Sequence, residues 1–256
     1  MNKNVPDDWK FVKFGEVVQH VKDRFPNRDE WTFDRFINGG HIDSGQIRIT
    51  KSSPIKGNEE TIGSAFHMRF KPGHVLYVSR RAYLRKGGIV DFEGICSNVT
   101  FVLQADETKL LQSLLPFIIQ TEAFVKHTVD NSHGSTNPFL NWKDIESYKM
   151  ILPPLEKQKK ISEILWSIED NIQKTEKLIE TTEKLKQELL NELLTKGIGH
   201  TRFKDSELGR IPEEWEVVEL GDYSKDIRYG YTDSASAVSY THLRAHETDS
   251  YLVCRL

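Results

Sequence analysis

The chain has 256 residues, of which 38% are hydrophobic and 10% aromatic, so it is long enough to bury one or two cores and is not a disordered chain. Its formal net charge is −3, no apolar run approaches the roughly 18 residues that span a bilayer, and Cys96 and Cys254 lie in unrelated contexts. We therefore exclude a disulfide-rich scaffold, a cysteine zinc site and a membrane protein, and expect a cytoplasmic globular protein.

A segment near the N-terminus occurs a second time 206 positions later. Residues 5–16 and residues 211–222 align without a gap, and each copy opens with an apolar residue, proline, two carboxylates and tryptophan. A repeat of this length predicts that the chain completes one domain and begins a second domain of the same kind.

The residues between the copies divide by composition. Residues 1–153 carry mixed patterns and end at a double proline, Pro153-Pro154. We assign them to a first domain, residues 154–197 to a long helix, and residues 198–234 to a linker with the start of a second domain.

The first domain carries both helical and strand patterns. Helical spacing of apolar residues predicts a short helix at residues 14–21 and a longer helical face from Leu110 to Ile119 that ends before Asn131. Alternation or apolar runs beside turn residues predict strands at residues 46–49, 75–78 and 99–103. The fold class expected is therefore α+β, with one mixed domain followed by a long coiled-coil-type helix.

The segment from Leu155 to Lys196 contains no glycine or proline and carries apolar residues at intervals of three and four. This pattern predicts one helix of about 60 Å at 1.5 Å per residue, ended by Gly197 and Gly199. An apolar seam of this length requires a partner, either another long helix or, as the alternative, the core of its own domain. The seam residues assigned to a helix interface are Ile164, Ile168, Ile172, Ile179 and Leu185.

The charge is distributed unevenly. Residues 48–90 hold nine basic and two acidic residues, a local net charge of +7 in a chain whose total is −3. A local basic field is what phosphate binding requires, although an ordinary solvated surface is the alternative.

Several motifs in this order resemble the specificity subunit of a type I restriction-modification system. Residues 151–161, from Ile-Leu-Pro-Pro-Leu onward, look like the family's entry into its conserved helix, and the Pro-x-x-Trp opening of each copy is similar to the start of each half. Residues 73–84 resemble a segment of the first target-recognition domain, with His74 where the family usually has aspartate. Residues 134–137 resemble the polar loop before the domain's closing strand.

The resemblance implies a sequence-specific DNA recognition subunit that reads half of a bipartite target. Its implied partners are double-stranded DNA, methyltransferase subunits docked on the helix and, through that complex, a restriction subunit; no membrane is involved. Because the apolar seam needs a partner, we also expect an antiparallel homodimer through the long helix. Arginine, asparagine, serine and threonine are residue types that contact phosphates and base edges. The DNA-binding residues expected are Lys51, Arg80, Arg81, Tyr83, Arg85, Lys86, Ser135, Thr136 and Asn137.

Each of these assignments has a structural alternative. Arg80 and Arg81 are equally compatible with plain surface cations, and residues 135–137 with an ordinary turn before Pro138. The second hypothesis for the whole chain is a non-catalytic coiled-coil adaptor whose basic module binds DNA or another anionic partner non-specifically.

An enzyme is the rival class. An adenine methyltransferase needs a glycine-rich cofactor turn and an Asn-Pro-Pro-aromatic corner, and Asn137-Pro138-Phe139 lacks the second proline. The sequence contains no HExxH motif, and His41, His127 and His133 are interpreted as surface or loop residues. We therefore expect no catalytic residues, no cofactor and no metal ligands.

The C-terminal segment departs from the family pattern. Residues 238–248 look like the translated end of a sequencing adaptor. We expect residues 235–256 to be a non-native tail that carries no function, with a natural polar tail as the alternative.

Overall fold

The computed structural model describes residue 6 and residues 8–223 of the chain. The chain divides into two compact units, Met1–Glu180 and Thr181–Leu256. A long helix, α5 (Leu155–Lys196), contributes residues to both units. The expected tail at residues 235–256, the end of the linker segment and Cys254 lie outside the described residues.

The first unit is built on two sheets and a strand pair. The elements before α5 are, in chain order, β1 (Lys10–Lys13), α1 (Phe14–Val17), β2 (Val18–His20), η1 (Arg28–Glu30), β3 (Arg35–Ile37), β4 (Arg48–Ile49), β5 (Ser53–Pro54), β6 (Phe66–Phe70), β7 (Val75–Val78), η2 (Ala82–Leu84), β8 (Gly87–Val90), β9 (Gly94–Ser97), β10 (Thr100–Ala105), η3 (Gln112–Leu114), α2 (Leu115–Ile118), α3 (Glu122–Asp130), α4 (Trp142–Glu146) and β11 (Lys149–Leu152).

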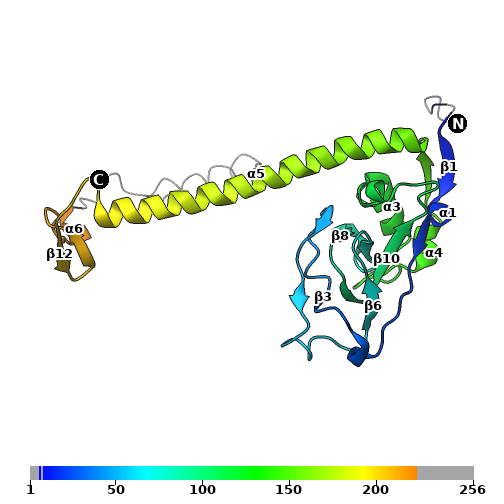
Figure 1. The fold of residues 1–256 in the computed structure, drawn as a ribbon, viewed down its shortest axis with the longest axis horizontal. Coiled ribbons are helices and arrows are strands. Elements are labelled where there is room, and N and C mark those ends of the chain that lie inside the picture. Colours follow the sequence, from blue (N-terminus) through cyan, green and yellow to red (C-terminus); the bar gives the residue numbers. More distant parts are fainter. Residues whose placement is uncertain (1–5, 7, 224–256) are drawn as a thin grey trace. The chain divides into compact units, whose positions relative to one another are not determined.

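One sheet has the strand order β2-β10-β7-β8-β4 and the other β5-β3-β9-β6, while β1 pairs with β11. The pairs β10–β7 and β7–β8 are antiparallel, whereas β4 runs parallel to β8 and β3 parallel to β9. The two strands of the β1–β11 pair lie just before α1 and just before α5 (Figure 1). The start and the end of the mixed domain are therefore joined.

The strand β7 contributes to two of the three core clusters of the described domain. All four of its residues are buried, and successive side chains of a strand point to opposite faces. Val75 and Tyr77 pack into a cluster with α1, α3 and β11, whereas Leu76 and Val78 pack into a cluster with β3, β6 and β9. An apolar run without alternation is therefore the pattern of a strand buried on both faces.

The predicted elements are present, but several differ in extent. The strand predicted at residues 46–49 covers only Arg48–Ile49, and the one predicted at 99–103 covers Thr100–Ala105. The first helix covers Phe14–Val17 alone, because Val18 begins β2 and pairs with Ala105 of β10. The helical face predicted from Leu110 is not one helix: it is divided into η3, α2 and α3.

The division of that helical face has a local cause. Residues 107–109 form a turn rather than the start of a helix. Pro116, which has no backbone N–H, stands in the first turn of α2. Thr121 then starts a new helix, because its Oγ1 accepts a hydrogen bond of 3.3 Å from the N–H of Phe124. As predicted, α3 ends before Asn131.

The helix α5 has the bounds that the sequence predicts. Pro153 and Pro154 precede it, and Gly197 follows it with φ +66°, a left-handed conformation that ends helices. Its apolar residues serve two different surfaces. Ile161 and Leu165 pack on the core of the mixed domain, whereas the five predicted seam residues are between 48% and 62% exposed. The first turns of the helix therefore pack on their own domain, whereas a helical partner for the five exposed seam residues stays a prediction.

The second unit begins within α5 and continues into the hairpin of β12 (Phe203–Ser206) and β13 (Gly209–Pro212), followed by α6 (Leu220–Tyr223). Trp215 lies beside His200, with ring centroids 6.0 Å apart. Together the described elements form the α+β arrangement expected, a mixed domain followed by a long helix (Figure 1).

Candidate nucleic-acid interface

The turn between β7 and β8 carries most of the predicted DNA-binding cations. Arg81 and Arg85 flank η2 with φ of 53° and 51°, the left-handed region that non-glycine residues rarely adopt. Two such residues within five positions cost roughly 1 to 2 kcal/mol each, so the surrounding structure must hold them. One bond that holds the turn runs from the backbone N–H of Arg81 to the carbonyl of Pro138, at 2.7 Å.

The predicted polar loop is the tip of a small hairpin. His133 and Phe139 exchange two backbone hydrogen bonds of 2.8 and 2.9 Å. Gly134 takes φ +88° at the start of the tip, where Ser135, Thr136 and Asn137 are exposed. The His133 ring contacts the Asp144 carboxylate at 3.0 Å. The three polar residues are thus presented to solvent on a fixed base.

The structure brings the arginine turn and the polar loop together. The Nε of Arg81 donates to Oδ1 of Asn137 at 3.3 Å, and the backbone N–H of Leu140 donates to the carbonyl of Ser79 at 2.9 Å. The guanidinium of Arg80 lies over the ring of Phe139, 5.8 Å from its centroid. Two segments about 55 positions apart in sequence therefore form one surface, which we call the loop pair (residues 79–86 and 132–139).

The amide of Asn137 is oriented within the loop pair. Its oxygen accepts from Arg81, so its NH2 group faces away from that guanidinium and keeps two donors. Arg80 and Arg81 are exposed, and Tyr83 on η2 is 54% exposed. The surface thus offers cations, amide donors, hydroxyls and an aromatic ring, the groups that contact phosphates and base edges.

The remaining predicted cations are already bonded within the protein. The two terminal nitrogens of Arg85 each donate at 2.6 Å to one oxygen of Glu122, and these bonds hold the pKa of the Glu122 carboxyl below its usual value. Lys86 donates to the carbonyl of Gly39, and Lys51 pairs with Asp43 at 2.6 Å. Arg85 and Lys86 therefore fasten the turn to its surroundings, whereas the ion pair of Lys51 lies outside the turn.

The positive electrostatic field of residues 48–90 is weaker than the number of their basic residues indicates. Carboxylates from other parts of the chain pair with four of its nine cations: Arg48, Lys51, Arg69 and Arg85. Within the described residues, Lys56, Lys71, Arg80 and Arg81 have no carboxylate within salt-bridge distance. Charge density in sequence does not reveal such pairings.

Sequence reasoning missed Phe139 and the role of His133. Phe139 is 39% exposed and carries Arg80 over its ring, while His133 closes the hairpin on the opposite strand. An aromatic residue directly after Asn137-Pro138 was the available signal, because arginine stacks readily on aromatic faces. His133 does lie in a loop, as predicted, with a structural contact to Asp144.

The described residues contain no group of three or more His, Cys, Asp or Glu side chains that could hold a metal ion. In this part of the chain, no helix is both long and apolar enough to cross a membrane. Cys96 is fully buried, and burial raises the pKa of its thiol. The loop pair remains the surface with the clearest binding chemistry.

Residues 6–184 match the family described as the type I restriction modification DNA specificity domain. The chain belongs to this family. It is 30% identical over 241 residues to the MjaVIII type I restriction enzyme specificity subunit of Methanocaldococcus jannaschii, covering 88% of this chain and 51% of that protein. It is 45% identical over 231 residues to the putative MjaX specificity subunit of the same organism, covering 85% and 53%.

Solved structures of the family share the fold. The crystal structure of the HsdS subunit from Thermoanaerobacter tengcongensis superposes with a TM-score of 0.57 at 21% identity, over 75% of this chain and 50% of that chain. The type I S subunit from M. genitalium gives a TM-score of 0.52 at 14% identity, over 75% and 47%. The chain spans about half the length of the specificity subunits that it matches.

Proposed function

We propose that this specificity-family chain reads one half of a bipartite DNA target through the loop pair of its mixed domain. The observation that carries the proposal is the junction of Arg80, Arg81 and Asn137, which come from two distant segments and meet at one exposed surface. Arginine pairs with guanine and asparagine with adenine in the major groove, so this combination of side chains can distinguish bases.

The contacts divide the predicted residues into two roles. Arg80, Arg81, Tyr83 and Asn137, with Ser135 and Thr136, are the proposed contacts to DNA. Arg85 and Lys86 fasten the turn through Glu122 and Gly39, while Lys51 is paired with Asp43 outside the turn. In this proposal Arg85 and Lys86 do not contact DNA and affect its binding only by holding the left-handed turn in place.

We infer that the chain contributes recognition and no catalysis, and that methyltransferase subunits, with a restriction subunit joined through them, supply the chemistry. Family membership supports this role. The chain alone should therefore bind no S-adenosylmethionine, which isothermal titration of the purified chain can measure. Tight cofactor binding would contradict the non-catalytic role. The proposed compartment is the cytoplasm.

Selection from a library of duplexes with a random central segment tests the proposal against the adaptor alternative. We expect the full chain to enrich one short motif. Asn137→Ala should relax the preference at a defined base position, because one matched side-chain contact is worth about 1 to 3 kcal/mol of discrimination. Lys10→Ala with Lys149→Ala, exposed cations of the β1–β11 pair, is the control and should leave the motif unchanged. Binding without any enriched motif supports the adaptor.

The exposed seam of α5 is the proposed site of a second helix. Five side chains that are 48% to 62% exposed would each contribute roughly 0.8 to 1.5 kcal/mol if a partner buried the rest of their surface, about half the value for a fully exposed side chain. We propose that a second copy of the chain binds here antiparallel, so that two identical mixed domains read an inverted repeat. A methyltransferase subunit could compete for the same seam.

Sedimentation of the full chain at tens of micromolar distinguishes these partners. A dimer that Ile168→Asp with Ile172→Asp dissociates supports self-association. Ser167→Asp with Asn171→Asp adds the same charge at the preceding exposed positions and should leave the dimer intact. A monomer, or a dimer that resists the seam variant, contradicts the homodimer.

A further inference from the structure

The first turns of α5 contact the mixed domain through side chains spaced four residues apart. Residues at this spacing lie on one face of a helix. Gln158 is buried: its Nε2 donates to the carbonyl of Lys109 at 2.8 Å, and its Oε1 accepts from the N–H of Leu111 at 3.0 Å. One turn later, Ser162 donates to the hydroxyl of Ser113 at 2.8 Å. These bonds fix the position of the helix start.

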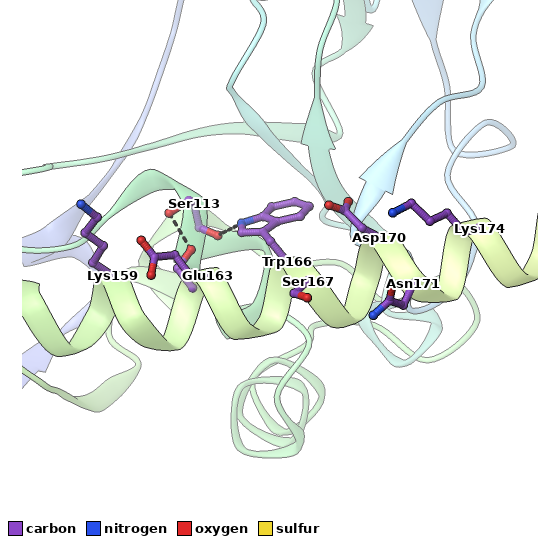
Figure 2. A pocket seen from close by; sticks show the side chains of 9 residues that line it. Ser113, Lys159, Glu163, Trp166, Ser167, Asp170, Asn171 and Lys174 are labelled. Atoms are coloured by element: carbon purple, nitrogen blue, oxygen red, sulfur yellow. Dashed lines mark hydrogen bonds between the residues drawn. The ribbon is translucent and has the colours of Figure 1, made fainter.

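Trp166, the third residue of this row, is held on several sides. Its indole N–H donates to the carbonyl of Ser113 at 2.9 Å, and its ring meets Phe117 edge-on at 5.0 Å between centroids. Figure 2 shows the indole beside Ser113, on the same side of α5 as Asp170. The guanidinium of Arg48 lies 4.4 Å from the ring centroid.

Arg48 links the sheet to the last residue of this row, Asp170. It belongs to β4, at the end of the strand order β2-β10-β7-β8-β4, and its terminal nitrogen donates to Oδ1 of Asp170 at 2.5 Å. Its Nε is buried without a hydrogen-bond partner among the described residues. Arg48 is therefore held between an indole face and a carboxylate, and is not available to DNA phosphates as its place in the basic stretch suggested.

Two hollows lie beside this contact. One of about 570 Å³ follows α5 past Ser113, Trp166 and Asp170 (Figure 2). Another of about 500 Å³ lies between residues 43–50 and the helix positions 169–176. Because the helix is not closely packed over this length, the direction it takes depends on a few side chains rather than on a continuous interface.

We propose that Arg48, Trp166 and Asp170 form an orientation clamp that fixes the direction in which α5 leaves the recognition domain, and thereby the separation of DNA half-sites that two such domains can read. The proposal rests on the proposed recognition function and homodimer. These three are positioning residues, which act through the helix and do not touch DNA.

A small shift at the clamp moves the far end of α5 by a larger distance, because the helix is long and pivots near its start. The clamp lies 8 to 12 residues beyond Gln158, which is about 12 to 18 Å along a helix. A shift of about 2 Å at Asp170 rotates the helix by roughly 6°, and at Lys196, the last residue of α5, this moves the axis by about 6 Å. That displacement corresponds to nearly two base-pair steps of about 3.4 Å.

Distance measurement between spin labels tests the clamp without DNA. Labels at Ala123→Cys on α3 and Thr175→Cys on α5, both exposed positions of the first unit, report the angle of the helix in the full chain carrying Cys254→Ser. We expect a narrow distance distribution that broadens in Arg48→Ala and is partly restored in Arg48→Lys, which keeps the charge but loses the planar stack. An unchanged distribution in Arg48→Ala overturns the clamp.

The control variant is Arg35→Ala. Arg35 also lies over an aromatic ring, that of Phe92, and also pairs with an aspartate, Asp34. It belongs to β3 and, in the described part of the chain, makes no hydrogen bond, ion pair or ring contact with α5. Its loss should leave the distance distribution narrow. Broadening in both variants would mean that general loosening of the domain, not the clamp, is being measured, and would overturn the proposal.

Duplexes carrying two inverted copies of the selected half-sequence, at separations increasing by single base pairs, give the functional readout. We expect Arg48→Ala to bind a single half-site as the unmodified chain does, while its preference for the best separation falls by roughly tenfold. A broadened label distance with an unchanged separation preference overturns the clamp. Failure of the unmodified chain to bind any half-site would instead contradict the proposed function, while the label result would still decide the geometry of the clamp.

Discussion

The two copies of the repeated segment have the same local structure in two different surroundings. In each copy the N–H of tryptophan donates to the carbonyl of the proline three residues earlier at 3.0 Å, in Trp9–Pro6 and in Trp215–Pro212. A four-residue helix then follows in each, starting at Phe14 and at Leu220, which are 206 positions apart like the repeat itself. The segment therefore encodes a turn and a short helix wherever it occurs.

What differs between the copies is pairing and burial. Lys10–Lys13 is strand β1, paired with β11, whereas residues 216–219 are not in a strand within the described part of the chain. Phe14 is fully buried, but Leu220 is 72% exposed. Local sequence thus sets the turn and the helix, while strand pairing and burial depend on the domain that surrounds the first copy.

The largest expected change in stability comes from removing the equivalent apolar side chain from each copy. Phe14 packs against Phe124 and Trp142 in the core, so Phe14→Ala should lower the free energy of unfolding by about 3 to 5 kcal/mol. Leu220→Ala should change it by less than about 0.5 kcal/mol. Chemical denaturation followed by circular dichroism measures both, and similar losses from the two variants would contradict the comparison.

A smaller loss of stability is expected at Gly197, the glycine that ends α5 and lies in the same unit as the second copy. A Cβ on Gly197 would lie 2.4 Å from the His200 ring and 2.9 Å from the Trp215 ring, at φ +66°. Gly199 has φ +74° and open space around it. Gly199→Ala should cost about 1 to 2 kcal/mol through backbone strain, and Gly197→Ala more, because the rings must also move. Equal losses in thermal unfolding would show that the ring contact is unimportant.

The smallest expected effect is a pH dependence of stability that arises from His20 in β2, the strand after the first copy. Burial, with Lys22 and Arg24 nearby, lowers the pKa of His20 from 6.5 to about 4. The neutral ring is the form compatible with the fold, so its contribution to stability is complete above pH 6.5 and is lost as the pH falls towards about 4. His20→Phe should remove this part of the acid sensitivity, since His20 already packs on Phe101 and Trp142. Identical pH profiles of stability for the variant and the unmodified chain would contradict this role.

Sequence periodicity predicted the elements whose signals are local. The bounds of α5 follow from Pro154 and Gly197, and the buried strand β7 follows from an apolar run after a turn. The helical face from Leu110 was predicted too long, because the apolar spacing continues across Pro116 and the capping Thr121. Periodicity reports which face is buried and does not report where the backbone breaks.

The candidate site was predictable in composition but not in its connections. Arginines and a polar loop identify the loop pair, yet the pairing of Arg85 with Glu122 joins residues 37 positions apart. The contact of Arg48 with Asp170 joins residues 122 positions apart. No local pattern distinguishes a cation that is free to bind phosphate from one that a distant carboxylate already binds. Such pairings are decided by the tertiary fold.

The salt dependence of duplex binding tests most directly whether the loop pair is the DNA-binding surface. Each lost phosphate contact should reduce the slope of log affinity against log salt by about 0.9. Arg80→Ala with Arg81→Ala should therefore make the slope shallower by about 0.9 to 1.8 between roughly 50 and 200 mM salt, depending on whether one or both side chains contact phosphates. Lys10→Ala with Lys149→Ala removes the same charge from the β1–β11 pair and should leave the slope unchanged. An unchanged slope in the arginine variant, or an equal change in the lysine control, would contradict the assignment of DNA binding to the loop pair.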